Sequence, residues 1–432
     1  MQKLRMVDLI SKKKAGEAHS VEEIKFIVDG VKNNSIPDYQ LSAWLMAVCL
    51  KGMTFDESAM LTEAMAKSGE IIDLSALGEY ISDKHSTGGV GDKTTLILAP
   101  LLASVGVKVA KLSGRGLGYT GGTIDKLESI EGYNPSLELD KFIEQVNTIG
   151  AAVISQTAKL APADSRLYAL RDVTATVDSI PLIASSVLSK KIASGANVIV
   201  LDVKYGSGAF MKTPEQAEEL SKTMVEIGKK LNRSITAVIT SMDQPLGNGI
   251  GNAIEVQESI DTLKNIGPKD LTDLSVYLAA VMMVNTKNAK TIEEAEKALR
   301  ESLANGKAYS KFIEMVEAQS AVKNFVLPTA EHLIEVKADS EGFITETDAL
   351  TIAKASKILG AGRETKEDPI DYAVGVVLTK KIGDKVAKGD TIAVVHANSL
   401  ELGKDAVKTC NKAFKYSSTP VEVPPIVHKV ID

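Results

Sequence analysis

Apolar residues recur at helical spacing through the first 70 residues of the chain. Ile and Val lie three or four positions apart over residues 24–31, and the same spacing returns over residues 41–48, where Trp44 is expected in the core. Ser20 precedes two glutamates and has the chemistry of an N-cap. Thr54 begins a third predicted helix. The pattern therefore predicts an all-α segment.

Strands and helices alternate in the middle of the chain. Short, nearly continuous apolar runs are typical of buried parallel strands, and an amphipathic helix is expected between two of them, at residues 214–231. This alternation predicts an α/β layer with a parallel sheet. Residues 164–195 and 255–320 are expected to be mostly helical. The expected strands are residues 107–110, 153–155, 197–203 and 237–240.

Short strands and turns dominate after about residue 330. Apolar runs at 374–378 and 391–396 flank residues 383–390, whose Gly-Asp pairs predict turns of β-hairpins. The segment resembles the compact β-fold of biotin and lipoyl carriers. It has no lysine at the hairpin tip that those carriers modify, so we expect a structural role.

Composition narrows the classes of function. The net charge is −6 and aromatic residues make up 4%, which argues against a nucleic-acid partner. Two cysteines cannot build a disulfide framework or a four-thiolate zinc site, and they fit a reducing cytosol. No secretory signal is visible, and the longest apolar stretch, residues 96–110, is too short to span a bilayer. We therefore expect a cytoplasmic protein that does not bind membranes.

Residues 83–95 form the first candidate site. This glycine-rich loop leads into an apolar helix, so backbone N–H groups and a helix N-terminus can converge on an anion. Lys84, Ser86 and Thr95 would add side-chain donors. The segment is not a P-loop, because Asp92 rather than glycine precedes Lys93. An ordinary polar loop is the alternative.

Residues 111–125 form a second glycine-rich loop after a predicted strand. Gly116–Gly121 matches the dinucleotide pattern G-x-G-x-x-G, and Glu138 and Asp140 lie about 20 residues further on, so a NAD-dependent dehydrogenase is the main alternative. However, Lys111 and Arg115 precede the pattern and Thr123 follows it. Two loops rich in Gly, Ser, Thr and Lys favour two walls around one free anion.

A third candidate site lies within residues 168–191. Arg171 and Lys190 carry positive charge within an otherwise apolar stretch, and Ser186 lies four residues before Lys190, on the same helical face. From spacing alone, the alternative is that Arg171 pairs with Asp172 or Asp178 while Lys190 is solvated.

The sequence resembles the thymidine and pyrimidine-nucleoside phosphorylases. The signature is SGRGLG at 113–118 followed by TGGTIDKLE at 120–128. The resemblance runs from Met6 to the C-terminus. The further matching blocks are residues 83–92, 168–186, 202–204, 206–211 and 244–247.

The resemblance implies a homodimer of two-lobed subunits. The small all-α lobe would hold residues 1–66 and 164–193, and the large α/β lobe, with a mainly parallel sheet and the phosphate site, residues 74–160 and 197–330. Residues 331–432 would form a C-terminal α+β part with a β-hairpin, hammerhead-like element. The cleft between the lobes must close, with hinges at the chain crossings 70–83, 155–164 and 191–196.

The implied reaction is the reversible phosphorolysis of pyrimidine nucleosides (uridine, thymidine, deoxyuridine) in nucleoside salvage. Phosphate is the co-substrate, the products are a free base and a pentose 1-phosphate, and no organic cofactor is needed. The lysine at position 111 is similar to the residue found in the broad-specificity bacterial enzymes of the family. A deoxy-specific thymidine phosphorylase remains the alternative.

The resemblance also assigns the site residues. His85, Arg171 and Lys190 would be catalytic, because they can stabilise the charge that develops on the departing base. The base would be bound by His85, Arg171, Ser186 and Lys190. The phosphate would be bound by Lys84, His85, Ser86, Thr95, Lys111, Leu112, Ser113 and Thr123.

Three positions depart from the usual family pattern: Tyr119, Tyr205 and Lys93. Related bacterial enzymes commonly carry threonine in place of Lys93, and some bind a structural potassium ion there. The remaining ligands would be carbonyls of Gly91, Leu246 and Gly249 and the carboxylate of Glu258. We expect the Lys93 ammonium group to replace the ion and pair with Glu258.

Overall fold

The N-terminal residues form a helical bundle, as the apolar spacing predicted. Two of its helices begin at capping boxes, in which the side chains of Ser20 and Thr54 accept hydrogen bonds from the backbone N–H groups of Glu23 and Glu57. Trp44 is fully buried in the bundle core. The helices are α1 (Met6–Lys14), α2 (Val21–Lys32), α3 (Asp38–Lys51) and α4 (Phe55–Ala66).

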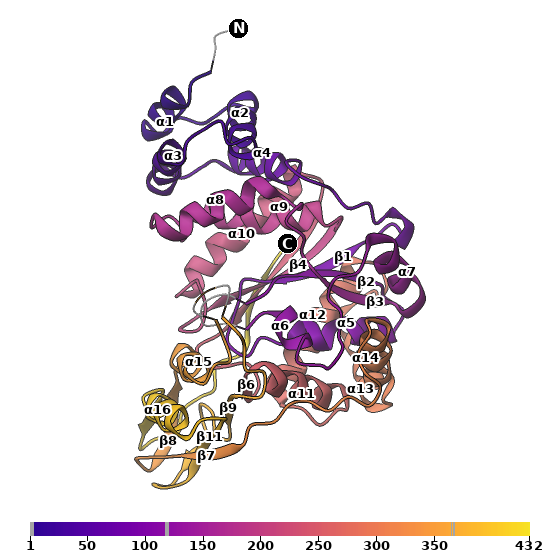
Figure 1. Cartoon of the computed structure of the whole chain (residues 1–432), viewed down its shortest axis with the longest axis vertical. Coiled ribbons are helices and arrows are strands. Elements are labelled where there is room, and N and C mark those ends of the chain that lie inside the picture. The colour runs from indigo at the N-terminus through magenta and orange to yellow at the C-terminus, as the bar shows by residue number, and fades with distance from the viewer. Residues whose placement is uncertain (1–3, 117–120, 364, 366–367) are drawn as a thin grey trace.

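The computed structural model describes residues 4–116, 121–363, 365 and 368–432. The bundle α1–α4 forms one end of the molecule, the strands and helices of residues 332–417 form the other end, and a mixed sheet lies between them (Figure 1). Within these described ranges, no helix combines the length and apolar character that crossing a bilayer requires.

The central sheet has six strands in the order β13-β5-β4-β1-β2-β3. All neighbours are parallel except β13, which runs antiparallel to β5, so the predicted parallel sheet is confirmed. The strands are β1 (Ser82–Ser86), β2 (Val109–Ser113), β3 (Ala151–Ser155), β4 (Val198–Tyr205), β5 (Ser234–Ser241) and β13 (Val427–Ile431).

One predicted strand was misplaced. Apolar content predicted a strand at residues 107–110, but β2 begins at Val109 and continues through Lys111 to Ser113. Its register is fixed by parallel pairing with β3, from Val109 opposite Ala151 onward. Pairing with a neighbouring strand therefore outweighs the polar character of Lys111 and Ser113.

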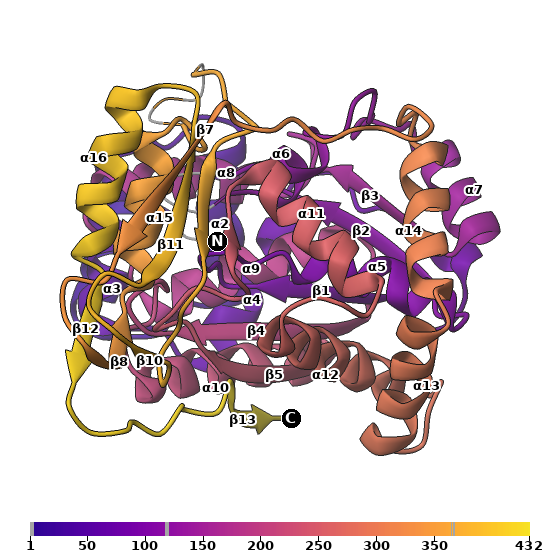
Figure 2. The same cartoon turned by 90° about the horizontal axis from the view of Figure 1, so that it is seen from below.

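Helices cover both faces of the sheet. Along β4, Ile199 and Leu201 pack toward α9 and α10, whereas Val200 packs toward α5 and α12 on the opposite face. Figure 2 shows α5, α11 and α12 on one side of the strands. The helices of this part are α5 (Thr94–Ser104), α6 (Thr123–Leu127), α7 (Leu139–Ile149), α10 (Pro214–Lys230), α11 (Asn252–Leu263), α12 (Lys269–Asn285), α13 (Ile292–Ala304) and α14 (Lys307–Ala318).

Helices α8 (Pro162–Val173) and α9 (Ile180–Ala193) lie between the bundle and the sheet (Figure 1). The three chain crossings beside them lie side by side: the backbone N–H of Glu70 donates to the carbonyl of Lys159 at 3.0 Å, and that of Ile72 to the carbonyl of Ala193 at 2.8 Å. A 3-10 turn, η1 (Ser75–Leu77), follows the first crossing.

The C-terminal part consists of two small antiparallel sheets with two helices. The predicted pairing of the apolar runs near 375 and 392 is confirmed, since β9 runs antiparallel to β11. The turn-rich segment between them contains β10, which pairs with β8 in the other sheet. The elements are β6 (Gly249–Ile250), β7 (His332–Lys337), β8 (Gly342–Thr347), α15 (Ala349–Ile358), β9 (Gly375–Leu378), β10 (Lys385–Val386), β11 (Thr391–Ala397), α16 (Leu400–Asn411) and β12 (Phe414–Ser417).

Candidate active site

The two glycine-rich loops leave the sheet from neighbouring strands. Ser86 ends β1 and Ser113 ends β2, and because these strands are parallel, both loops start at the same edge of the sheet. The first loop leads into α5, which begins at Thr94 and carries buried Thr95 in its first turn. This edge therefore combines hydroxyl groups, glycine-rich backbone and a helix N-terminus, a composition suited to an anion.

Lys84 lies beneath this edge within a buried network. Its ammonium group donates to the hydroxyl of Thr94 at 2.6 Å and lies 3.3 Å from a carboxylate oxygen of Asp202. Asp202 also pairs with Lys204 at 2.9 Å. Asp92 lies 3.7 Å from Lys84, and its pKa is held well below the usual range because, despite burial, Lys84 and Lys204 stabilise the charged form.

His85 lies on the same strand, on the face that turns toward α9. Burial, together with the charges of Lys191, Lys111 and Lys84, lowers the pKa of the His85 imidazole well below its ordinary value. The ring is therefore neutral near pH 7 and offers a hydrogen-bond donor rather than a charged acid.

Arg171 is held by backbone carbonyls. Its guanidinium group donates to the carbonyls of Thr176 at 3.2 Å, Val177 at 2.7 Å and Leu182 at 3.1 Å. The alternative interpretation from spacing, an ion pair with Asp172 or Asp178, is therefore wrong. Carbonyl partners leave its positive charge uncompensated by direct contact.

Lys190 pairs with Asp164 of α8 and donates to the hydroxyl of Ser186 at 3.2 Å. Its side chain is 28% exposed, so the alternative of a solvated lysine is also wrong. The ring of Tyr168 lies under both cations, 5.9 Å from the Arg171 guanidinium and 6.0 Å from the Lys190 ammonium group.

A cavity of about 110 Å³ joins residues that are distant in the sequence. His85 from β1, Arg171 from α8 and Ser186 from α9 all line it. Its remaining wall is largely apolar, with Tyr168, Val177, Ile183, Val187, Phe210, Met211 and Leu220 beside Thr87. The structure thus brings three of the four predicted base-binding residues into one apolar-walled space, and the fourth, Lys190, contacts Ser186 at its border.

Lys111 and Leu112 have partners inside the protein. The Lys111 ammonium group lies 2.9 Å from a carboxylate oxygen of Asp83 and donates to the carbonyl of Lys84 at 2.8 Å. The Leu112 side chain is buried, and its carbonyl accepts from Lys191 at 3.3 Å. Direct contact between Lys111 and phosphate would therefore compete with these partners.

The second loop is described at its two ends. Residues 117–120, and with them Tyr119 and most of the Gly116–Gly121 pattern, lie outside the described residues. The loop re-enters at Gly122, and Thr123 begins α6. A Cβ at Gly122 would lie 2.1 Å from the backbone nitrogen of Gly116, so the two ends of the loop meet closely.

Lys93 fills the position that the family resemblance gave to potassium. Its ammonium group donates to the carbonyls of Leu246 at 3.0 Å and Gly249 at 2.9 Å and to the carboxylate of Glu258 at 2.5 Å. The side chain is fully buried. Burial opposes its charge, yet Glu258 and neighbouring Glu255 hold the pKa of Lys93 above its ordinary value. The residues present therefore do not fit a bound potassium ion in addition.

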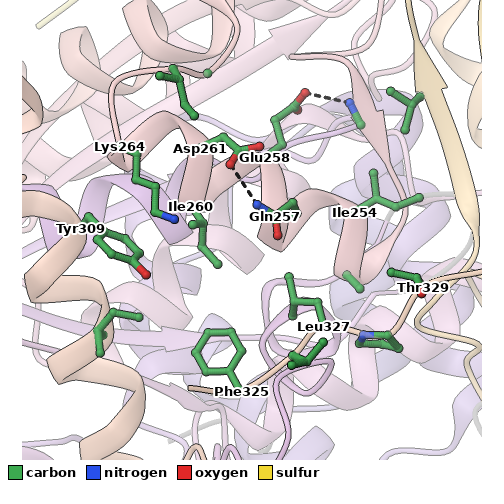
Figure 3. A pocket seen from close by; sticks show the side chains of 18 of the residues that line it. Ile254, Gln257, Glu258, Ile260, Asp261, Lys264, Tyr309, Phe325, Leu327 and Thr329 are labelled. Atoms are coloured by element: carbon green, nitrogen blue, oxygen red, sulfur yellow. Dashed lines mark hydrogen bonds between the residues drawn. The ribbon is translucent and has the colours of Figure 1, made fainter. Parts of the chain in front are cut away.

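A larger cavity lies elsewhere, between α11, α14 and the segment before β7, with a volume of about 1210 Å³ (Figure 3). None of the predicted base- or phosphate-binding residues lines it. Its wall carries one lysine, Lys264, which lies over the ring of Tyr309. The charged wall residues are otherwise four carboxylates: Glu258, Asp261, Glu314 and Glu317. Such a wall repels phosphate, so size alone does not identify the active site.

Sequence reasoning missed Asp164 as the partner of Lys190, and Asp83 and Lys191 beneath His85. A signal existed for the first, because Asp164, Tyr168 and Arg171 are spaced four and three apart on one helix. Asp83 and Lys191 are more than 100 residues apart, and no local pattern joins them.

Comparison with known proteins identifies the family of the chain. Residues 78–309 match the α/β domain of a glycosyl transferase family, residues 7–69 match its helical bundle domain, and residues 343–417 match the pyrimidine nucleoside phosphorylase C-terminal domain. The pyrimidine-nucleoside phosphorylase of Staphylococcus haemolyticus is 52% identical over 99% of this chain and 100% of its own length. Those of Staphylococcus aureus and Staphylococcus epidermidis are 51% identical with the same coverage.

A solved structure shares the fold. The anthranilate phosphoribosyltransferase of Thermus thermophilus superposes with a TM-score of 0.60 at 19% identity, covering 72% of this chain and 99% of that one. At this identity the likeness concerns the fold alone. The full-length identity of about half to the phosphorylases is the stronger finding, and it shows that the chain belongs to the pyrimidine-nucleoside phosphorylase family of glycosyltransferase enzymes.

Proposed function

We propose that the family's reaction, phosphorolysis of a pyrimidine nucleoside, takes place between the sheet edge at Ser86 and Ser113 and the cavity beside α8 and α9. The observation that carries this proposal is the convergence of His85, Arg171 and Ser186 on one cavity next to the two anion-suited loops. The base would enter the cavity and the phosphate would bind at the loops, with the sugar between them.

The base side supplies electrostatic stabilisation. As the glycosidic bond breaks, the pyrimidine gains negative charge on its oxygens and N3. Arg171 faces this charge without a carboxylate partner, and Lys190 adds a second cation while Ser186 donates a hydrogen bond. Neutral His85 donates a hydrogen bond to the base oxygen nearest the phosphate loop.

Positive charge exceeds negative charge around the two proposed sites taken together. Six buried or half-buried basic side chains lie there against four carboxylates, which favours the binding of an anion. Ser86, Thr95, Ser113 and Thr123 would donate to the phosphate directly. The cations are Lys84, Lys111, Arg171, Lys190, Lys191 and Lys204, and the carboxylates are Asp83, Asp92, Asp164 and Asp202.

An ultraviolet assay of uridine, thymidine and deoxyuridine, with and without phosphate, tests the proposal. We expect turnover that requires phosphate, and its relative rates will define the preferred sugar and base. Arg171→Ala and Lys190→Ala should each lower kcat about 100-fold, as loss of one preorganised donor typically does, with unchanged circular dichroism. Phosphate-independent turnover, or full activity in both variants, would refute the assignment.

We propose that a second copy of the chain covers the outer face of α1 and α3. The two helices expose large apolar side chains: Val7 of α1 is 51% exposed, and Tyr39 and Leu50 of α3 are each 74% exposed. Analytical ultracentrifugation should give twice the chain mass of 46.0 kDa, and Leu50→Glu should give the single mass.

The two free cysteines fit a reducing compartment, so we place the enzyme in the cytoplasm.

We further propose that the protein needs no potassium ion, because Lys93 supplies the positive charge at that position. Three oxygen atoms surround its ammonium group within 3.0 Å. The experiment that tests this substitution opens the Discussion.

A further inference from the structure

Strands β1 and β2 separate toward the edge that carries the two loops. Their ladder has a single register pair among the described residues, Ser82 opposite Val109. By contrast, β1 stays paired with β4 over five positions, as far as Ser86 opposite Asp202. The backbone carbonyls that point from β1 and β2 into the gap between them therefore need other partners.

Two lysine ammonium groups fill the gap between the separating strands. Lys111 donates to the carbonyl of Lys84 on β1 at 2.8 Å, and Lys191 donates to the carbonyl of Leu112 on β2 at 3.3 Å. Asp83 stands between them, with one carboxylate oxygen 2.9 Å from Lys111 and the other accepting from Lys191 at 2.7 Å. The cluster thus spans β1, β2 and α9.

The cluster is closed to solvent. The side chains of Asp83, Lys111 and Lys191 are 2%, 7% and 1% exposed. The two ammonium groups hold the pKa of Asp83 below its ordinary value although burial opposes this. Burial and the charge of Lys191 lower the pKa of Lys111 to about 7, with Asp83 opposing the shift. Such a costly arrangement is weak evidence for stability but can fix geometry.

We propose that Asp83, Lys111 and Lys191 are positioning residues that set the distance between the two phosphate-binding loops and seat α9 over the gap. The residue before Lys191 is Lys190, so the same helix end carries the base-site cation and its anchor in the sheet. The inference rests on the proposed function, which assigns phosphate binding to the two loops. It changes the expected role of Lys111 from a phosphate ligand to a residue that supports the phosphate site.

Asp83→Asn distinguishes direct phosphate binding by Lys111 from a spacing role, because the two predict opposite changes in the KM for phosphate. If Lys111 bound phosphate directly, removing its competing carboxylate would leave the KM for phosphate unchanged or lower. If the cluster is a spacer, the two ammonium groups lose their common anion, the loops shift, and the KM for phosphate rises at least about fivefold. We expect the rise, with faster amide hydrogen exchange in residues 87–93 and unchanged exchange in α12.

Lys191 offers a second, independent variant. Lys191→Gln should raise the KM for phosphate and Lys191→Arg, which keeps the charge, should restore it. Lys108→Met, which removes an exposed lysine just before β2 that bonds the carbonyl of Leu77, is the matched control and should change neither KM. If Asp83→Asn does not fold, the Lys191 pair decides the question.

The outcomes also distinguish this inference from the proposed function. Calorimetric titration with inorganic phosphate reports on the loops even without turnover. If wild type binds phosphate but shows no phosphorolysis, the proposed function fails and weaker binding in Asp83→Asn still supports the spacer. A folded Asp83→Asn with unchanged or tighter phosphate binding overturns the spacer and leaves the proposed function intact.

Discussion

Replacing Lys93 tests whether an ammonium group stands in for a structural cation. In Lys93→Met the carboxylate of Glu258 loses its counter-charge, and the carbonyls of Leu246 and Gly249 lose their donor. Removing one partner of a buried ion pair typically destabilises by about 3–5 kcal/mol. Glu258 is 12% exposed and keeps two backbone donors, so we expect about 3 kcal/mol, or a fall in Tm of roughly 3 °C for a chain of 432 residues.

The companion variant Lys93→Thr should create dependence on potassium. It leaves two carbonyls, a carboxylate and a new hydroxyl around a space of ammonium size, and oxygen donors suit a hard cation. At a potassium concentration of about 100 times Kd, binding to the folded state contributes about 2.7 kcal/mol, which restores most of the lost Tm. Differential scanning calorimetry in KCl, NaCl and choline chloride at equal ionic strength measures this directly.

The wild-type protein should have the same Tm and the same activity in all three salts. Lys269→Thr, at a lysine whose side chain is 89% exposed, is the control and should show no salt-specific change. A wild-type protein that needs potassium for activity would refute the reasoning, as would a folded Lys93→Thr with an undiminished Tm in choline chloride.

Three further predictions address the site and the bundle. Asp164→Asn removes the partner of Lys190 and should raise the KM for nucleoside about tenfold while leaving the KM for phosphate unchanged in initial-rate assays. Gly122→Ala should abolish most phosphate-dependent turnover because its Cβ would meet backbone, whereas Gly114→Ala, with nothing within 4 Å, should retain it. Burial, with the charge of a nearby lysine, lowers the pKa of His19, so the unfolded state binds a proton more readily than the folded state does. The free energy of unfolding should therefore fall as pH drops below about 6.5. His19→Gln should reduce this dependence of unfolding free energy on pH, measured by urea titration.

The local pattern was sufficient for elements whose contacts lie nearby in the chain. Apolar spacing located the N-terminal helices, and buried runs located β4 and β5, because the periodicity of a segment records which of its faces is covered. It failed at β2, where Lys111 and Ser113 look like loop residues. They lie in a strand because β2 pairs with β3, some 40 residues later in the chain. The local sequence of β2 does not indicate this pairing.

Residue types predicted which side chains would lie near one another but not their contacts. They indicated the two loops and the cations that we propose to bind the base, and His85, Arg171 and Ser186 do line one cavity. The partners of those cations were not accessible in this way. Spacing alone left an ion pair of Arg171 with Asp172 or Asp178 as the alternative, yet Arg171 binds backbone carbonyls whose positions depend on how the helices pack.

The buried lysines of this chain share one arrangement that explains why so many are tolerated. Among the described residues, seven lysines are almost fully buried, and each has both a carboxylate partner and a backbone carbonyl or hydroxyl acceptor: Lys13, Lys84, Lys93, Lys111, Lys126, Lys191 and Lys204. Hydrophobic replacements of similar volume would hold a core as well or better. What they would not provide is a donor that fixes separated strands and loops at hydrogen-bond distance. Four of the seven (Lys84, Lys111, Lys191 and Lys204) lie under the sheet edge where we propose that the two loops bind phosphate, so a shift of a fraction of an ångström there would alter binding more than stability.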